Sequence, residues 1–239
     1  MPLSRVKKSR MGVILHIESA AEGCSVAVSR DGELLFEKID LTIKNNAITL
    51  GLFVDSALSF LDSRGILLDA VAVSEGPGSY TGLRIGVSMA KGICYGRSIP
   101  LLSVPTLKIL TVPTLLTDEL PEDALLCPMI DARRMEVYSA IYDRALNSIR
   151  ATHADIIDTT SYQEYLDRNI IYFLGNGAEK CKGVITHPNA RFIDGAKPLA
   201  KWMYPLAELA LNRGEFRDVA YFEPYYLKDF VAIKSKKLL

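Results

Sequence analysis

The order of predicted elements along the chain constrains its fold most, because the same order occurs twice. In the first half, three β-rich runs starting at Val13 precede an alternation of helix, strand, helix, strand and helix. The second half follows the same plan, from three candidate strands that begin at Leu125 to a last long helix over about residues 197–212. The sequence therefore predicts an α/β chain built from two βββαβαβα lobes.

Two such units side by side form the plan of actin-like ATPases, hexokinases and sugar kinases, so we expect this actin-like (ASKHA) architecture. The repeat lies in the element order and not in the residues. A stretch with two prolines and four acidic residues, 112–123, marks the boundary between the lobes. We predict a disordered extension over residues 1–12, a first lobe over 13–116 and a second lobe over 117–239.

Charge and cysteine content limit the class of protein. Lys and Arg together number 28, as do Asp and Glu, and this balance argues against a chain that binds RNA or DNA alone. A role inside an RNA-binding complex stays open. The four cysteines are widely spaced, which favours reduced thiols over a zinc site or a disulfide framework. Because no apolar run approaches the ~20 residues of a membrane span, we expect a cytoplasmic protein that does not contact a membrane.

A loop rich in glycine and proline, EGPGSYTG, connects a predicted strand over 68–74 to a predicted helix over 81–95. Pro77 followed by Gly78 fits a type II turn, and Ser79 or Thr81 provides a hydroxyl that caps the helix. Free amides at such a helix start also suit an anion. The loop has neither the Walker lysine nor a G-x-G-x-x-G pattern, so its chemistry favours a plain strand-to-helix corner.

Two predicted helices have too little polar surface for helices that face water on one side. The helix over 47–62 carries a core stripe and, opposite to it, a face with one acid and two large aliphatic side chains. That face consists of Ile48, Leu52, Asp55, Ser56 and Ser59. The helix after the corner has a second, small-residue face of Ile85, Met89, Gly92 and Gly96. Either the neighbouring lobe buries these faces, or another subunit docks on them; the residues alone leave both possibilities open.

The corner sequence GPGSYTGLRIG resembles a characteristic stretch of the TsaB (YeaZ) family, bacterial proteins of tRNA threonylcarbamoyladenosine modification. Further segments match the family in the same order, over about residues 13–228: ILHIESAAEGCSVAV, VPTL, IDARRMEVYSAIY and EPYYLK. The residues that carry the family motifs are Gly76, Pro77, Gly78, Thr81, Gly82, Arg84, Asp131 and Arg133.

This resemblance implies a non-catalytic scaffold subunit that dimerises with a TsaD-like enzyme. A TsaE-like ATPase is a further expected partner, tRNA is expected to bind only through the complex, and the chain alone is expected to form a homodimer. The resemblance also favours docking over internal burial for the two apolar helix faces. The expected interface residues are Ile48, Leu52, Ser56, Ile85, Met89 and Gly92.

Catalytic groups are scarce in the sequence. TsaD-like relatives carry an H-x-x-x-H metal pair on their first long helix, whereas this chain has Asn45 and Asn46 in the corresponding stretch. No Ser, His and Asp stand at a spacing typical of a peptidase. We therefore expect no metal site and no catalytic residue. An independent ATP-dependent phosphotransferase of the actin fold and a peptidase-like homodimer are the alternatives.

Two further positions invite a ligand. Glu18 and Ser19 occupy the hairpin where actin-like folds hold phosphate and metal, although the family more often has Asp and Thr there, and a polar turn is the simpler interpretation. We expect no cofactor in the chain alone, while ATP or ADP with Mg²⁺ at a subunit junction stays open. Arg133 pairs with Asp131 or Glu136 in the simpler interpretation, or else binds an outside anion.

Overall fold

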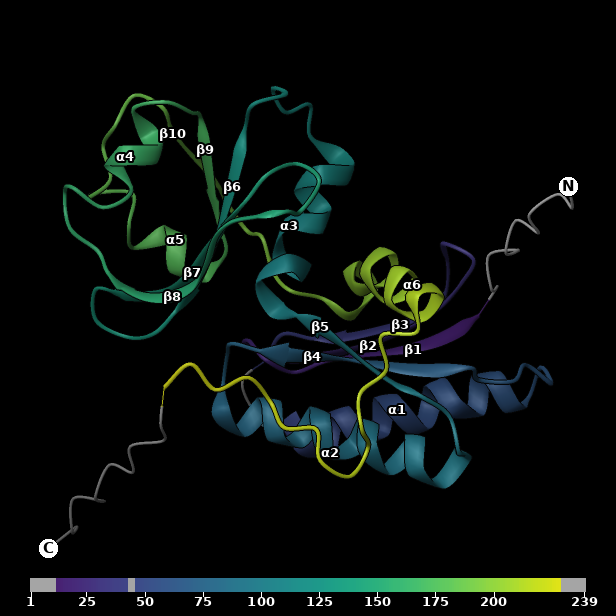
Figure 1. The fold of residues 1–239 in the computed structure, drawn as a ribbon. Helices are drawn as coiled ribbons and strands as arrows, with labels where there is room; N and C mark the ends of the chain where they lie inside the picture. Colours follow the sequence, from purple (N-terminus) through teal and green to yellow (C-terminus); the bar gives the residue numbers. More distant parts are fainter. Residues whose placement is uncertain (1–11, 43–45, 229–239) are drawn as a thin grey trace, which may run out of the picture.

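The computed structural model describes residues 12–42 and 46–228, which form two lobes connected by α3 and by the returning C-terminal segment (Figure 1). The extension predicted over residues 1–12 lies outside the described residues except for Gly12, which is buried. Asn45 lies outside them as well. No helix within the described ranges is long and apolar enough to cross a membrane.

The first lobe begins with three strands and continues as an alternation of helices and strands, as the sequence predicts. Its elements are β1 (Val13–Glu18), β2 (Cys24–Arg30), β3 (Glu33–Asp40), α1 (Asn46–Asp62), β4 (Ala70–Gly76), α2 (Tyr80–Arg97) and β5 (Leu101–Pro105). The helix α3 (Thr106–Thr117) then leads to the second lobe.

The second lobe has the same strand plan with much shorter helices. Its elements are β6 (Leu125–Asp131), β7 (Glu136–Tyr142), β8 (Ser148–Ile156), α4 (Gln163–Leu166), β9 (Ile171–Leu174), α5 (Asn176–Glu179) and β10 (Ala190–Ile193). A 3₁₀ turn, η1 (Ala200–Met203), and the helix α6 (Tyr204–Arg213) follow.

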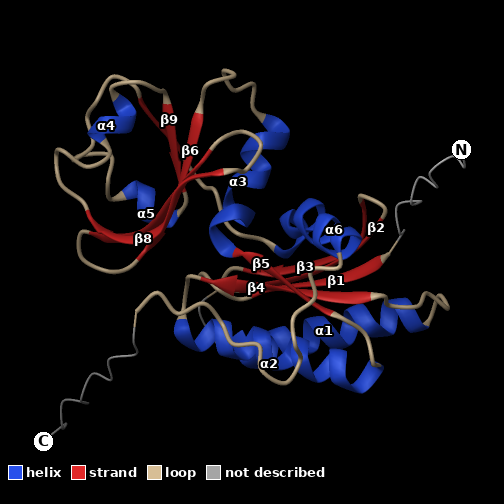
Figure 2. Cartoon of the chain, in the orientation of Figure 1, coloured by secondary structure: helices blue, strands red, loops and turns tan. Residues whose placement is uncertain are grey.

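Each lobe contains one five-stranded mixed sheet, and the two sheets have matching topology (Figure 2). The order is β3-β2-β1-β4-β5 in the first lobe and β8-β7-β6-β9-β10 in the second. In both, the first strand pairs antiparallel with the next strand along the chain and parallel with the fourth. All six residues of β1 are buried, because helices cover both faces of its sheet. The duplicated topology confirms the predicted actin-like fold.

The helices cover the first sheet unequally. The long helices α1 and α2 lie on its outer face, away from the second lobe, while α3, α6 and η1 lie on the face toward that lobe (Figure 1). We expected α6 to complete the second repeat, and this was wrong. Ala207 and Leu211 of α6 are buried with Ile14 of β1 and Leu102 of β5. The first sheet needs apolar cover on its inner face, and the end of the chain provides it.

The helix α3 contributes to the cores of both lobes. Ile109 is buried in the cluster between the first sheet and α6. Leu107 and Leu110, on another side of the same helix, are buried in the cluster that contains Leu126 and Leu174 of the second sheet. Because one helix supplies side chains to two cores, the lobes are joined by packing as well as by chain connection.

The segment 216–228, here called the strap, returns from α6 across the first lobe. The Arg217 amide donates to Leu101 O at the edge of the first sheet (2.8 Å), and the Tyr225 amide donates to Glu75 O (2.7 Å). Between them the strap lies over α2, where Lys91 Nζ donates to the carbonyls of Ala220 and Phe222. Its end reaches the second lobe.

Candidate functional site

The glycine-rich corner between β4 and α2 has a conformation that the sequence did not predict. Gly78 does not adopt positive φ; instead Gly76 has φ +109°, and the Gly76–Pro77 peptide bond is cis. The expected type II turn is therefore wrong. A β-carbon at Gly76 would lie 2.6 Å from Tyr225 O of the strap, and a contact so distant in sequence leaves no trace in local turn statistics.

The next glycines bring the β1–β2 hairpin against the start of α2. The Ser79 amide donates to Ala20 O (2.7 Å), and Ser19 Oγ donates to Gly82 O (2.8 Å). A β-carbon at Gly78 would lie 2.2 Å from Ala20 O, and one at Gly82 would lie 2.0 Å from Ser19 O. Only glycine allows this approach, so the corner fastens α2 to the first hairpin.

The start of α2 has a hydroxyl cap, and Ser79 provides it rather than Thr81, the other predicted candidate. Ser79 is the N-cap of α2, and its side chain accepts a hydrogen bond from the Gly82 amide (3.2 Å). Thr81 is exposed and is not the cap. Because the cap and the hairpin contacts use the Ser79 and Gly82 amides, these groups are not available to an external anion.

Glu18 and Ser19 are closed off by the same contacts. Their exposed fractions are 2% and 1%. Glu18 Oε1 accepts from the Ala20 amide (2.6 Å), while Oε2 has no hydrogen-bond partner among the described residues. Burial raises the pKa of Glu18 to about 7, against the opposing effect of the Ala20 amide. These positions do not fit a phosphate or magnesium site in the chain alone, and a nucleotide at a subunit junction stays a prediction.

The predicted docking face lies on the outer side of α1 and α2. Ile48 and Leu52 of α1 are 67% and 63% exposed. On α2, Ile85 and Met89 are partly buried, and a β-carbon at Gly92 would meet no atom within 4 Å. Ser56 is partly buried, and its hydroxyl donates to Leu52 O of the same helix. The second lobe does not cover this face (Figure 1), so burial by the far lobe does not explain it.

A different side of α2 is covered by the strap. Arg84 lies over the Tyr80 ring, 4.3 Å from its centroid, and its Nε donates to Tyr226 Oη (3.3 Å). The Tyr80 and Tyr226 rings lie 4.8 Å apart between centroids. Sequence reasoning noted the segment EPYYLK as a family resemblance but assigned it no role. Two adjacent tyrosines near the chain end were the available clue.

The β6–β7 hairpin places Asp131 and Arg133 differently from the simpler expectation. Asp131 forms its ion pair with Lys180, and the contact with Arg133 is a hydrogen bond from the backbone amide to Asp131 Oδ1 (2.8 Å). Glu136 pairs with Lys228 of the strap. The expected internal salt bridge of the Arg133 guanidinium is therefore absent among the described residues, because lysines occupy both acids.

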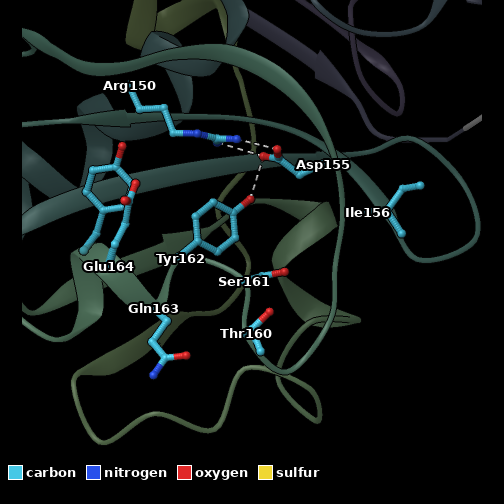
Figure 3. A pocket seen from close by; sticks show the side chains of 9 residues that line it. Arg150, Asp155, Ile156, Thr160, Ser161, Tyr162, Gln163 and Glu164 are labelled. Carbon is cyan, nitrogen blue, oxygen red and sulfur yellow. Dashed lines mark hydrogen bonds and ion pairs between the residues drawn. The ribbon is translucent and has the colours of Figure 1, made fainter.

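A pocket of about 370 Å³ lies on the second lobe, between β8 and α4 (Figure 3). Its most prominent side chains already bind one another. Arg150 forms a two-point ion pair with Asp155, and Tyr162 Oη donates to Asp155 Oδ2 (2.9 Å). Burial opposes ionisation of Asp155, but hydrogen bonds from Arg150, Ser139 and Tyr162 outweigh it and keep its pKa below the ordinary value. This network holds β8 against α4 and offers few free polar groups to a ligand.

The histidines do not form a reactive centre. His16 and Ser29 form a hydrogen-bonded pair (2.8 Å) that is fully buried between β1 and β2. Burial lowers the pKa of His16 to about 3, so this ring is neutral. His153 and His187 contact Ala151 O and Asp167. Across the part of the chain that the structure describes, no three His, Cys, Asp or Glu side chains gather as a metal site.

Comparison with known proteins gives the family. The sequence profile of TsaD, tRNA N6-adenosine threonylcarbamoyltransferase, matches residues 40–193, well over half of the chain. The Escherichia coli tRNA threonylcarbamoyladenosine biosynthesis protein TsaB is 28% identical, in an alignment that covers 93% of this chain and 97% of that protein. The chain belongs to the TsaB (YeaZ) family. The Bacillus subtilis TsaB protein is 34% identical over an alignment covering 54% of each protein.

Solved structures agree with the TsaB assignment at the level of fold. A Pseudomonas aeruginosa protein, described as uncharacterized with similarity to peptidase YEAZ, superposes with a TM-score of 0.78 at 24% identity. The superposition covers 91% of this chain and all of that one. The two-lobed architecture of this chain is thus one that solved structures contain.

Proposed function

We propose that this chain takes part in the biosynthesis of threonylcarbamoyladenosine in tRNA as a non-catalytic subunit that docks on a TsaD-like enzyme. Membership of the TsaB family supports the pathway. The observation that carries the docking role is the outer face of α1 and α2, where two large aliphatic side chains remain about two-thirds exposed. Burying these two side chains stabilises a complex by roughly 2–4 kcal/mol.

The composition of the docking face suits a helical partner. Gly92 and Gly96 leave open space along α2, and small residues allow a second helix to approach the backbone closely. Gly51 of α1 faces Met89 of α2, since a β-carbon there would lie 3.9 Å from Met89 Cε. The face is thus continuous across both helices and has few charges, as the core of a stable interface requires.

Other parts of the proposal concern the assembly. A homodimer of the chain alone uses the same face isologously, and the TsaD-like partner replaces one copy. A TsaE-like ATPase joins the assembly, nucleotide binds at a subunit junction, and tRNA is held by the complex in the cytoplasm. The closed hairpin at Glu18 and Ser19 supports a chain without phosphotransferase activity of its own.

Charge placed on the docking face tests the proposal. We expect Leu52→Glu to weaken binding of the TsaD-like partner at least ~100-fold, because the interface would bury an unpaired carboxylate. Titration calorimetry with the purified partner measures this, and thermal melting checks that the exposed substitution leaves the fold intact. Ile156→Glu is the matched control, since Ile156 is 77% exposed on the other lobe.

Equal affinities for the two variants would contradict docking through this face. The non-catalytic part of the proposal has its own test, in which the purified chain is incubated with tRNA and an activated threonylcarbamoyl donor. Formation of threonylcarbamoyladenosine without a partner would refute it. Titration with Mg-ATP alone separates this function from an independent phosphotransferase, which must bind nucleotide without partners.

A further inference from the structure

The β6–β7 hairpin presents two adjacent arginines in a conformation that L-residues rarely adopt. Arg133 has φ +72° and Arg134 has φ +51°, both in the left-handed region. Arg133 lies near enough to Asp131 to favour its ionised form. Nevertheless, neither guanidinium forms a hydrogen bond or an ion pair with any residue that the structure describes. Both side chains are exposed.

Contacts from behind hold this hairpin in place. Lys180 Nζ donates to three oxygens of the hairpin: the Asp131 carboxylate, Arg134 O (2.7 Å) and Glu136 O (2.6 Å). The Asp131 amide donates to Asn176 Oδ1 (3.0 Å). A lysine that uses all its donors on one loop fixes the loop before any ligand arrives, which lowers the entropy cost of binding. The side chains of Arg133 and Arg134 therefore extend from a backbone that is already fixed in position.

The strap brings aromatic groups to the same end of the molecule. Lys228 pairs with Glu136 at the foot of the hairpin, and the ring of Tyr226, two residues earlier, packs at a tilt against Tyr80 at the start of α2. Tyr225 is 45% exposed. Figure 1 shows the end of the strap reaching past the start of α2 toward the second lobe.

The charges at this end do not cancel. Lysines neutralise both acids of the hairpin, as described above, and Glu223 of the strap lies near Arg84. Arg133 and Arg134 form no ion pair with a described residue, although Arg133 lies near Asp131. With two acids, two lysines and two arginines, the hairpin and its two lysine partners together carry about two positive charges in excess. On a chain with no net charge overall, this is a local feature of one hairpin.

We propose that the β6–β7 hairpin contacts the phosphate backbone of the RNA held by the assembly, through the guanidinium groups of Arg133 and Arg134. This inference rests on the proposed function, which brings tRNA to the complex. Guanidinium groups match phosphate oxygens in two-point hydrogen bonds. The exposed ring of Tyr225, on the strap that Lys228 joins to the hairpin, offers a face on which a base can stack. Two contacts are too few for tight binding alone, which agrees with the neutral chain.

The test uses the full chain assembled with its TsaD-like partner and an unmodified tRNA transcript as the probe. Affinity is measured over a series of salt concentrations for the natural chain and for the double variant R133A/R134A. Loss of two phosphate contacts is expected to reduce the slope of log affinity against log salt by about 1.4 and to weaken binding roughly 10–30-fold near 0.1 M salt. The matched control, R144A/R168A, removes two exposed arginines elsewhere on the second lobe and should change affinity less than about twofold.

Other outcomes overturn the inference. A slope for R133A/R134A equal to that of the control does so, and so does a loss of ATP binding with unchanged tRNA affinity, which would assign the hairpin to a nucleotide. Failure of the natural chain to assemble contradicts the proposed function instead. Because the inference rests on the proposed function, that outcome overturns both, whereas equal slopes in an intact assembly overturn the hairpin contact alone.

Discussion

The two lobes differ in the exposure and pKa of the carboxyl group at the end of their first strand. Glu18 ends β1 and Asp131 ends β6, so each carboxylate lies at the end of the first strand of its sheet. Glu18 is 2% exposed, and burial raises its pKa to about 7. The Asp131 side chain is 46% exposed. Its partial burial is outweighed by hydrogen bonds from Lys180 and the Arg133 amide, which hold its pKa below the ordinary value.

The difference arises in the helix that follows the fourth strand of each lobe. The first corner lies between β4 and α2; the second corner, with Gly175 and Gly177, lies at the junction of β9 and α5. In the first lobe, Gly78 and Gly82, before and within the 18-residue helix α2, lie directly against the hairpin backbone, and residues 18–20 of the hairpin are buried. In the second lobe, α5 has four residues, and the polar side chains of Asn176 and Lys180 hold the hairpin from one side. Backbone contact closes the first hairpin, whereas side-chain contact leaves the second one accessible.

A repeated fold can thus divide its roles between its copies. The closed first hairpin keeps α2 fixed, so that the outer face of α1 and α2 is a rigid apolar surface. The second lobe, with minimal helices, offers a charged hairpin in place of an apolar surface. Four predictions examine this contrast.

Closing the first corner should depend on Gly82 most strongly. We expect Gly82→Ala to lower the free energy of unfolding by about 3–5 kcal/mol, because the new β-carbon would lie 2.0 Å from Ser19 O. Gly177→Ala in the second corner should cost less, about 1–3 kcal/mol, since its nearest atom is 2.9 Å away. Urea denaturation measures both.

Gly92→Ala serves as the control for a helical glycine with open space around it. It should raise stability by roughly 0.5–1 kcal/mol, because alanine restricts the unfolded chain and favours the helix. If Gly82→Ala changed the free energy of unfolding as little as Gly92→Ala, the close contact between the corner and the hairpin would not contribute to stability.

Stability should depend on pH through Glu18. The native carboxyl has a raised pKa of about 7 against 4.5 in the unfolded chain, so the native state binds more protons between these values. The contribution of Glu18 is therefore fully favourable below about pH 4.5 and falls as pH rises, by about 3 kcal/mol in total above pH 7. Glu18→Gln should remove this loss, and urea midpoints at pH 5 and pH 8 measure it.

The contribution of Asp131 to stability should depend on pH in the opposite direction, and Asp131→Asn tests this. The native pKa of Asp131 is lowered, so its contribution is present above the ordinary pKa and disappears as pH falls through the native value. The variant should thus lose stability near neutral pH and not in acid. A Glu18→Gln profile parallel to that of the natural chain would show that the buried hairpin does not retain its proton.

The second hairpin should depend on Lys180. We expect Lys180→Met to lower the free energy of unfolding by roughly 1–2 kcal/mol, because three oxygens lose their donor while water can reach some of them. The pKa of Asp131 should rise toward its ordinary value, which a carboxylate NMR titration follows. Lys182→Met is a suitable control, since Lys182 pairs with Glu179 and Asp194 outside the hairpin. An unchanged pKa of Asp131 in Lys180→Met would contradict the stabilisation of the hairpin by Lys180.

The smallest effect should come from the helix cap. Ser79→Ala removes the acceptor for the Gly82 amide and should cost about 1 kcal/mol. Ser79→Thr keeps a hydroxyl and should recover most of this loss in urea denaturation. The second corner offers no equivalent change, because α5 has no side-chain cap. Equal stability of the alanine variant and the natural chain would mean that the hairpin contacts alone hold the corner.

Much of the fold follows from patterns that act over a few residues. Alternation and turn residues located the strands, and the sequence predicted a hydroxyl cap from Ser79 or Thr81, of which the structure has Ser79. The duplicated element order predicted the two sheets. Helical periodicity identified the second apolar face at Ile48 and Leu52, but it left open whether the other lobe buries that face; the structure shows both side chains exposed.

The remaining features depend on contacts between distant segments. The corner geometry depends on the Tyr225 carbonyl, about 150 residues along the chain, and the placement of α6 depends on an uncovered sheet face in the other lobe. Lys180, at the end of α5, forms its ion pair with Asp131 at the end of β6, 49 residues earlier, which no spacing in the sequence indicates. Local patterns set the propensity of each segment, whereas these tertiary contacts decide between alternatives that are locally equivalent.

The helix α3 has a consequence for how the molecule comes apart. Its side chains are buried in both lobes at once, so neither lobe can melt without exposing apolar surface that belongs to the other. Heat should therefore unfold the chain in one calorimetric transition despite its duplicated sheets. Damage to either half would consequently deprive a cell of the whole protein.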